Sequence, residues 1–453
     1  MLVTLLLACR GAEPPEILDV HIETDPDTPG VATVSFTTSE DAVATVSVDG
    51  RSTPSDAGGT DHVIEVRGLV LGQTATLVLS AVGEHGTGTA EEALDVGSAR
   101  ADLPPVERTA WDEARACGDG YLVTSVLTLG GSSFVVVLDR EGRPVWARPG
   151  EQGEWLSRVR PSADGSGLVW LHNDPNRRDD LGRITRVAWD GEVLSETRAW
   201  QAHHDFVERP EGGFAFLSYV FSLGADVEGV TRDVATDAIL EIEEGGAEGE
   251  ERSVFSMLED YAGGLFDPGV SSVESGFLPD YWEFSHGNSL MMDPDGATYH
   301  VMFRWLDALI EVDRASSTQT WQLGGARSDF TGPAGEDFSH AHMSEWWDGG
   351  FVVFDNADET GGISGAAEYA VDEDARTWDR VWDARDPEGH LELLLGDVIR
   401  VPGCENRMVA WSTSSRVDEV TPDGDVVWSL STPAGWIVSR ISWVPDLYSS
   451  GER

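Results

Sequence analysis

The chain has 453 residues, with 30 Lys and Arg against 81 Asp and Glu, and its formal net charge at pH 7 is −51. This balance argues against nucleic acids and anionic membrane surfaces as partners, because the overall electric field repels polyanions. The length allows two domains with cores of their own, and no stretch after the N-terminus is apolar for long enough to form a transmembrane helix.

The N-terminus is a short apolar run that ends at a cysteine, MLVTLLLAC. The run is too short to span a bilayer. Its last residues, Leu6-Leu7-Ala8 before Cys9, resemble the end of a bacterial lipoprotein signal, although the usual basic segment is missing. We therefore expect residues 1–15 to be a signal segment and tether of an exported lipoprotein, anchored through Cys9 in the periplasm or at the cell surface. A plain apolar N-terminus is the alternative.

Residues 16–99 have the pattern of an all-β sandwich. Short segments that alternate apolar and polar side chains predict strands; they are 17–23, 32–37, 42–48, 62–66, 75–82 and 90–96. The segment VRGLVLGQTATLVLSAV resembles the E–F region of fibronectin type III domains, so we expect an immunoglobulin- or fibronectin III-like sandwich. The histidines of this part, His21, His62 and His85, are scattered, and we expect them on the surface.

Residues 110–453 carry a repeated unit of four short strands with a period of roughly 40–50 residues, which is typical of a β-propeller. The clearest unit covers 282–325. Its strands are predicted from 286 to the turn at 294–296, at 298–305, at 308–312 and from 321 onward. We count about six such units. The predicted fold is therefore all-β, with the sandwich followed by a six-bladed propeller.

Two further cysteines lie beside glycines in turn-like contexts. Cys117 precedes the first unit and Cys404 lies in the last one. These two units are neighbours in a closed ring, and an exported protein permits a disulfide between them. Two free thiols are the alternative.

Five histidines open three successive units: His203, His204, His286, His340 and His342. In a propeller the first strand of each blade lines the central channel, so equivalent positions converge at one mouth of it. Asn288 is two residues beyond His286, and residues so spaced share one face of a strand. The same spacing relates His340 and His342. Arg304, on the following strand, adds a fixed cation.

Such a set of side chains suits more than one chemistry. A neutral imidazole is a nucleophile and a general base near neutral pH. Arginine and further imidazoles stabilise charge on a transferring oxyanion group. Transfer of a sulfuryl or phosphoryl group through a covalent histidine fits, and so does a Zn²⁺ or Cu²⁺ site with three or four histidine ligands. A channel plug held by hydrogen bonds is the third option.

Four phrases occur in a fixed order, and they are HHD with PEGG, FSHGNSL, FRWLDALIEVD with WQLGG, and HAHM with DGGFVVFDN. In this order they resemble the arylsulfotransferase family, bacterial aryl-sulfate sulfotransferases that need no nucleotide sulfate donor. The resemblance covers most of 203–356 and continues weakly to the C-terminus. It implies a six-bladed propeller behind a small β-sandwich, an exported or lipid-anchored protein, and no cofactor or metal.

The resemblance also implies roles for single residues. His342 matches the nucleophile that is transiently sulfated. The family usually has Gln-His-Asp where this chain has Ala341-His342-Met343, so His340 is the second choice. His286 and Asn288 match an H-x-N motif, Arg304 matches the arginine that follows it, and His204 matches the histidine of the H-H-D motif. Of the neighbouring imidazoles, His203 and His340 are expected to bind substrate. Asp205 either orients His204 through a hydrogen bond or is a plain turn aspartate.

The implied reaction is a ping-pong transfer from an aryl sulfate to a phenol, both small molecules. The alternative is a non-catalytic or metal-binding surface propeller that acts as a binding module. Contact with a membrane is expected through the lipid anchor only, and a homodimer is one option for the oligomeric state. Four tryptophans either wall an aromatic substrate site or belong to the core; they are Trp282, Trp305, Trp346 and Trp347. No role follows for Arg440.

Overall fold

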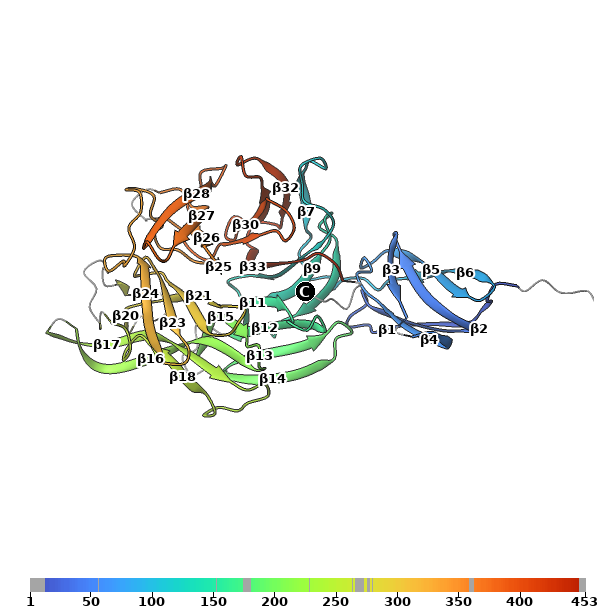
Figure 1. Ribbon diagram of the computed structural model, residues 1–453, viewed down its shortest axis with the longest axis horizontal. Helices are drawn as coiled ribbons and strands as arrows, with labels where there is room; N and C mark the ends of the chain where they lie inside the picture. Colours follow the sequence, from blue (N-terminus) through green and yellow to red (C-terminus); the bar gives the residue numbers. More distant parts are fainter. Residues whose placement is uncertain are drawn as a thin grey trace, which may run out of the picture.

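The computed structural model describes residues 13–447, apart from 56, 152, 174–180, 228, 263, 265–272, 275–277, 279 and 358–361. The regular structure of these residues consists of strands. Within the described ranges, no helix is long and apolar enough to cross a membrane. The predicted lipid anchor, Cys9, lies outside the described residues. Figure 1 shows a small β part at the N-terminal end, drawn in blue, beside a larger group of sheets arranged around a common axis.

The N-terminal part contains β1 (Ile17–Thr24), β2 (Ala32–Val48), β3 (Arg51–Pro54), β4 (Gly59–Val66), β5 (Thr74–Gly83) and β6 (Gly86–Asp95). The first half of β2 pairs with β1 and β4, and its second half pairs with β3 and β5. Two strands expected from the sequence are therefore one long strand shared by two sets of partners. Alternate side chains of β2, such as Val34, Phe36 and Val46, are buried in the core between them. The relation to fibronectin III domains stays a prediction.

The expectation that His62 lies on the surface is wrong. Alternate residues of β4 point inward, and His62 is one of them, with 2% of its surface exposed. Its ring lies 5.0 Å from that of Phe36, and its Nε2 lies 3.2 Å from the hydroxyl of Thr38. This histidine is part of the N-terminal core.

The remaining strands form six further sheets among the described residues. The first has the order β33 (Ile437–Val444), β8 (Tyr121–Leu127), β9 (Ser133–Leu138) and β10 (Pro144–Pro149). The second consists of β11 (Trp155–Pro161), β12 (Gly167–Asn173), β13 (Leu181–Ala188) and β14 (Val193–Trp200). The third consists of β15 (Ala202–Glu208), β16 (Phe214–Val227), β17 (Val230–Ile242) and β18 (Arg252–Ser256), with the short strands β19 (Val273–Glu274) and β20 (Trp282–Glu283) beside β17.

The other three sheets continue the series. The fourth consists of β21 (Gly287–Met292), β22 (Thr298–Phe303), β23 (Ala308–Asp313) and β24 (Thr318–Gly324). The fifth consists of β25 (Ser344–Trp347), β26 (Gly350–Asp355), β27 (Gly365–Asp372) and β28 (Thr377–Arg385). The last has the order β29 (Asp397–Arg400), β30 (Arg407–Trp411), β31 (Arg416–Val420), β32 (Val426–Ser431) and β7 (Glu107–Trp111).

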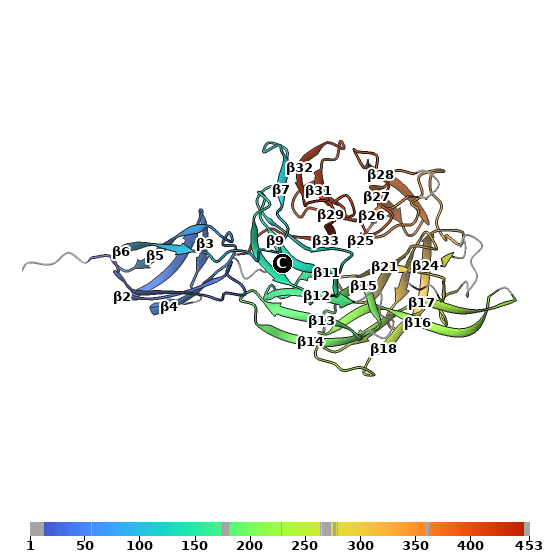
Figure 2. The same cartoon turned by 180° about the vertical axis from the view of Figure 1, so that it is seen from behind.

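The innermost strands of these sheets form a ring. β11 contacts β15, β15 contacts β21, β21 contacts β25, β25 contacts β29, and β29 contacts β33, which returns to β11. Figures 1 and 2 show the sheets fanning out from this ring on both views. The result is the propeller-like, all-β arrangement that the repeat predicts. Two strands close the ring from the ends of the propeller segment: β33 joins the first sheet and β7 joins the last. The sequence units did not include either of them.

The ring closure is also covalent. Cys117, just before β8, is bonded to Cys404, in the loop between β29 and β30, across a sequence separation of 287 residues. A buried ion pair lies at the same seam, where the Arg140 guanidinium is 2.5 Å from a carboxylate oxygen of Glu419. The other carboxylate oxygen of Glu419 accepts a hydrogen bond from the backbone N–H of Cys117. The first and last sheets are therefore joined by strand pairing, an ion pair and a disulfide.

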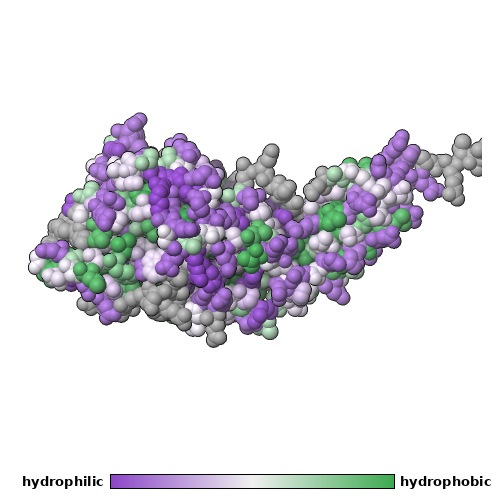
Figure 3. All heavy atoms as spheres, turned by 90° about the horizontal axis from the view of Figure 1, so that it is seen from below, coloured by the Kyte–Doolittle hydropathy of each residue, from purple (hydrophilic) through white to green (hydrophobic). Residues whose placement is uncertain are grey.

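The surface agrees with the acidic composition. Figure 3 shows hydrophilic residues spread over both parts of the molecule on the face that it presents, with hydrophobic residues scattered between them.

The N-terminal part and the propeller-like part are in contact. The backbone N–H of Leu71 donates to the carbonyl of Pro144 at 2.9 Å, and Val145 and Trp146 belong to the same core as the N-terminal strands.

Replacing both cysteines, Cys117→Ser with Cys404→Ser, is expected to lower the free energy of unfolding by about 2–5 kcal/mol, because the disulfide closes a long loop and restricts the unfolded chain. Urea titration followed by tryptophan fluorescence measures the change. Wild-type protein in a reducing agent should shift in the same direction. Equal unfolding midpoints for the double variant and the oxidised wild type would show that the non-covalent seam holds the ring alone.

Candidate active site

Three histidines from three successive sheets meet at one end of the ring. The ring centroid of His204 lies 4.9 Å from that of His286 and 5.7 Å from that of His342. His204 is in β15, His286 immediately precedes β21, and His342 lies two residues before β25. Because these are the innermost strands of neighbouring sheets, the histidines converge as their positions in the repeat lead us to expect.

The backbone at this end departs from strand geometry. His204, His286 and His340 have φ values of 57°, 55° and 50°, in the left-handed region that side chains other than glycine rarely adopt. Such residues cost of order 1–3 kcal/mol each and persist where their surroundings fix them. The prediction that His286 shares a strand face with Asn288, and His340 with His342, is wrong in its premise, since neither His286, His340 nor His342 is in a strand.

His342 is buried, with 3% of its surface exposed. Its Nδ1 lies 3.2 Å from the carbonyl oxygen of Gly396. A carbonyl oxygen only accepts hydrogen bonds, so Nδ1 carries the proton and Nε2 carries the lone pair. Burial, and then the positive charges of Arg440 and Arg304, hold the pKa of His342 well below its ordinary value. The imidazole is therefore neutral at pH 7, with a free lone pair on Nε2.

His204 is supported by its neighbour in sequence. Its Nδ1 lies 2.8 Å from the Nδ1 of His203, whose Nε2 lies 3.0 Å from a carboxylate oxygen of Asp237. The ring of Tyr219 stacks on that of His203 at 3.8 Å. Burial, followed by the charges of His286 and His203, lowers the pKa of His204 well below its ordinary value. His203 is buried behind His204, so the structure places it as a support for that ring.

His286 has a carboxylate partner. Its Nδ1 lies 2.7 Å from an oxygen of Glu283, and the indole N–H of Trp305 donates to the other oxygen at 3.2 Å. Trp305 is partly exposed, and its ring lies 5.5 Å from His286 and 5.6 Å from His340. Among the described residues, the ring contact of His340 goes to Trp305 and not to the three clustered histidines. His340 is thus at the edge of the cluster.

Arg304 and Asn288 complete the group. One terminal nitrogen of Arg304 donates to the carbonyl of His340 at 3.1 Å and to the side-chain oxygen of Asn356 at 3.2 Å. The side-chain amide of Asn288 donates to the carbonyl of Ala341 at 2.9 Å, which ties β21 to the segment that carries His342. The structure therefore brings together all five residues matched to catalytic roles, which are His204, His286, Asn288, Arg304 and His342.

Asp205 plays neither of the two roles considered for it. It is fully buried in β15, where Arg160 lies 3.0 Å and Arg158 lies 3.7 Å from one carboxylate oxygen. Arg440 lies 3.5 Å from the other oxygen, which also accepts a hydrogen bond from the backbone N–H of Leu290 at 3.1 Å. Burial alone would raise the pKa of Asp205, but the arginines outweigh it and hold this pKa below its ordinary value. No hydrogen bond to His204 is present among its described contacts.

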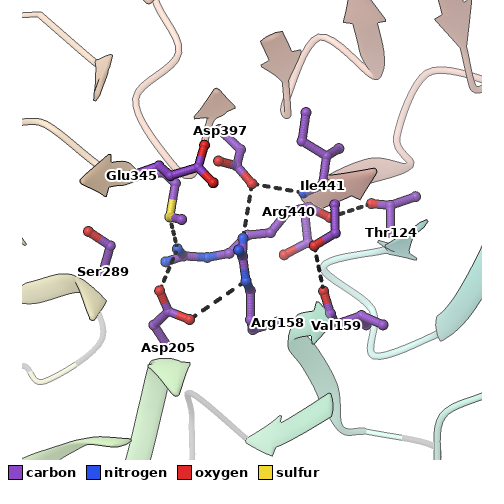
Figure 4. A network of polar contacts seen from close by, with 12 residues as sticks. Thr124, Arg158, Val159, Asp205, Ser289, Glu345, Asp397, Arg440 and Ile441 are labelled. Atoms are coloured by element: carbon purple, nitrogen blue, oxygen red, sulfur yellow. Dashed lines mark hydrogen bonds and ion pairs between the residues drawn. The ribbon is translucent and has the colours of Figure 1, made fainter. Parts of the chain in front are cut away.

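Asp205 and its arginine partners belong to a layer of charged side chains at the centre of the ring of inner strands. Figure 4 shows four charged side chains pointing toward one another from different inner strands: Arg158, Asp205, Asp397 and Arg440. Arg158 lies 3.1 Å from Asp397, whose carboxylate also accepts from the backbone N–H of Ile441 at 2.8 Å. Arg440, which had no predicted role, donates to the backbone carbonyl of Asn288. Two cations and two anions thus close the channel next to the histidines.

A group of ligand atoms close enough together for one metal ion lies outside the histidine cluster. Among the described residues, one group of three His, Cys, Asp or Glu ligand atoms lies close enough together for a single ion, and it consists of Cys117, Cys404 and Glu419. Its two sulfurs are already joined in the disulfide. The clustered histidines are not in this group, and their Nδ1 atoms lie against Glu283, Gly396 and His203.

Comparison with known proteins gives a family match. The model of the family described as arylsulfotransferase (ASST) matches residues 112–391, more than half of the chain. This range contains Asn288, Arg304 and the five histidines of the site: His203, His204, His286, His340 and His342. None of the curated proteins matches the chain.

Solved structures that resemble the chain include propeller and lactonase proteins. The periplasmic gluconolactonase PpgL of Pseudomonas aeruginosa has 16% identity and a TM-score of 0.39, covering 72% of this chain and 99% of its own. A putative 6-phosphogluconolactonase from Bacteroides fragilis has 12% identity and a TM-score of 0.38, with 72% and 98% covered. The β-propeller domain of Cps50 (Swd1) from Myceliophteria thermophila has 12% identity and a TM-score of 0.38, with 67% and 84% covered. Such low values carry no argument about the activity of this chain.

The variant Asp205→Asn is expected to lower the free energy of unfolding by about 3–5 kcal/mol, because it leaves buried arginines without their anionic partner. Chemical denaturation measures this loss. Asp102→Asn, which breaks an ion pair that is 62% and 61% exposed, is the matched control and should leave the unfolding midpoint nearly unchanged. Normal stability of Asp205→Asn would show that the buried layer does not hold the ring together.

Proposed function

This chain belongs to the arylsulfotransferase family, and on that premise we propose that it moves a sulfuryl group from an aryl sulfate to a phenol through a sulfohistidine at His342. The observation that carries the proposal is the state of that imidazole. Its Nδ1–H donates to the Gly396 carbonyl, and two nearby arginines oppose its protonation. A neutral imidazole with a free Nε2 is the form that attacks sulfur.

The first half reaction follows from this arrangement. The lone pair of His342 Nε2 attacks the sulfur of the aryl sulfate, and the bond from sulfur to the aryl oxygen breaks. Arg304, His204 and the amide of Asn288 lie around His342, where a cation and hydrogen-bond donors stabilise the negative sulfuryl oxygens. In the second half reaction a phenol oxygen attacks the same sulfur, and the electron pair of the nitrogen–sulfur bond returns to Nε2.

Aromatic side chains beside the histidine cluster favour the proposal that the substrates are aryl compounds. Trp305 is partly exposed next to His286. The ring of Tyr219 stacks on that of His203 and lies 5.9 Å from that of Phe221, which lies 4.7 Å from that of Tyr281. These three rings are also partly exposed, and flat apolar faces of this kind pack well against aryl groups. Of the four tryptophans considered from the sequence, Trp305 is the one that adjoins the histidines. Trp282 is buried in a hydrophobic core cluster, and Trp346 and Trp347 pack against another such cluster.

The local charge also suits an anionic donor. The protein as a whole is strongly acidic, yet Arg304 and Arg440 both lie close enough to His342 to lower its pKa. A cationic site inside an acidic protein compensates for the repulsion that a sulfate ester meets at the surface.

We further propose that the protein is exported and anchored through a lipid on Cys9. The disulfide between Cys117 and Cys404 supports export, because such bonds persist in oxidising compartments. Metabolic labelling with a fatty-acid analogue tests the anchor, and a Cys9→Ser variant should lose the label.

Wild-type protein is expected to release p-nitrophenol from p-nitrophenyl sulfate only slowly alone, and much faster when a phenol is added as acceptor. His342→Ala should abolish this acceptor-dependent release, because the proposed sulfohistidine cannot form without the His342 imidazole. His340→Ala is the matched control, since His340 lies at the edge of the cluster beside Trp305, and it should keep most of the activity. Loss in His340→Ala alone would move the nucleophile. An inactive wild type that contains bound metal would favour a metal-binding propeller instead.

The activity is expected to persist on acidification. Because the pKa of His342 is lowered, protonation of the nucleophile begins only at a pH below the usual value of about 6.5. The kcat/KM for p-nitrophenyl sulfate should therefore stay level from pH 8 to below pH 6.5, measured by stopping each reaction in alkali and reading p-nitrophenolate. The Arg304→Met variant removes a cation that opposes protonation of His342, so the fall of kcat/KM on the acidic side should move to a higher pH. A wild-type profile that falls with a midpoint near pH 6.5 or above contradicts the assignment of a nucleophile whose pKa is lowered.

A further inference from the structure

Two buried carboxylates contact histidines in or beside the cluster and have no part in the reaction proposed above. Asp237, in β17, lies against His203, one residue away from the cluster. Glu283, in β20, lies against His286 itself. Neither residue belongs to the phrases that carried the family resemblance to catalytic roles, and both have about 1% of their side-chain surface exposed.

Glu283 is built to remain ionised. Its two carboxylate oxygens are occupied by different donors, with His286 Nδ1 at 2.7 Å and the indole N–H of Trp305 at 3.2 Å. Burial alone would raise the pKa of Glu283, but the charge of His286 and its hydrogen bond outweigh burial and lower this pKa. A carboxylate only accepts hydrogen bonds, so Nδ1 of His286 carries a proton. The Nε2 of His286 is then the atom left to exchange a proton with a substrate.

His286 and His342 differ in the group that accepts the hydrogen bond from Nδ1. His342 donates to a neutral carbonyl and faces Arg440 and Arg304, which oppose a second proton. His286 donates to an anion, so its Nδ1 proton is held by a buried carboxylate instead of a neutral carbonyl. Titratable groups near His286 include His204 and His342, whose pKa values are lowered, and Asp237, whose carboxylate adds a further negative charge.

We propose that Glu283 is a positioning residue that makes His286 the proton carrier of both half reactions, so that nucleophile and proton carrier are different imidazoles. The inference rests on the proposed function. In the first half reaction, His342 Nε2 bonds to sulfur, the sulfur–oxygen bond breaks, and the proton on His286 Nε2 goes to the leaving aryl oxygen. In the second, the acceptor phenol gives its proton to His286 Nε2 while its oxygen bonds to sulfur and the nitrogen–sulfur bond breaks. Each cycle returns both imidazoles to their starting states.

The role of a proton donor is visible in how the rate depends on the leaving group. A phenolate that is a poor leaving group needs a proton as it departs, whereas p-nitrophenolate is stable enough to leave without one. The test compares kcat/KM for phenyl sulfate and for p-nitrophenyl sulfate, because in a ping-pong reaction this constant for the donor reports the first half reaction only.

In Glu283→Gln, kcat/KM for phenyl sulfate is expected to fall at least about 100-fold, and that for p-nitrophenyl sulfate less than about tenfold, since general acid catalysis contributes on the order of 10²–10⁴. His286→Asn removes the proton carrier without touching the buried glutamate and should give the same unequal loss. It keeps the inference testable if Glu283→Gln does not fold, which the thermal unfolding midpoint of each variant reveals.

Glu311→Gln is the matched control. Glu311 in β23 lies 3.2 Å from His300 in β22, in the sheet that also contains β21. The ring of His300 stacks on that of Trp346 rather than on the clustered histidines. This variant should leave the ratio of the two donors unchanged. Equal losses for both donors in Glu283→Gln and His286→Asn, with an active wild type, overturn the proton-carrier role alone. A wild type that transfers no sulfuryl group from either donor overturns the proposed function, and this inference with it.

Discussion

The buried charges on the ring axis are the constraint on which this end of the molecule depends. Arg158, Asp205, Asp397 and Arg440 come from four inner strands and have almost no exposed surface. Buried charges are tolerated only when they are paired with good geometry. The ring can therefore close only when β11, β15, β29 and β33 stand at the right height relative to one another. The same layer fixes backbone groups of β21 and β33, through Leu290 and Ile441.

The layer also sets the chemistry of the histidines next to it. Arg440 reaches from β33 to the backbone of Asn288, which places its guanidinium directly beside the cluster. Its charge is the largest electrostatic influence on the pKa of His342 after burial. A structural device for closing a propeller channel thus keeps a nearby imidazole neutral. In a protein with a net charge of −51, Arg440 and Arg304 are the cations that an anionic group would meet beside His342.

The sequence predicted the parts of this structure that depend on local pattern. Alternating apolar residues and Asp-Gly turns placed β21 to β23 within a few residues, and the repeat brought His204, His286 and His342 to one end of the ring. Contacts between residues far apart in sequence were not predictable in this way. From the sequence, Asp205 was either a partner of His204 or a plain turn aspartate, whereas its partners are Arg158, Arg160 and Arg440. A charged residue inside the apolar stretch WIVSRI was the one local signal for Arg440, and for β33 as an inner strand.

The functional difference between the histidines illustrates the same limit. Without the family resemblance, the repeat alone makes His286 and His342 equivalent: each opens a unit, and each could accept or donate a proton. What separates them is the atom that holds Nδ1, a carboxylate from β20 in one case and a carbonyl from the loop before β29 in the other. Either partner fixes the proton on Nδ1 and leaves Nε2 toward the reaction. Only the carboxylate is itself charged, so two identical side chains are suited to different steps because of residues that no motif includes.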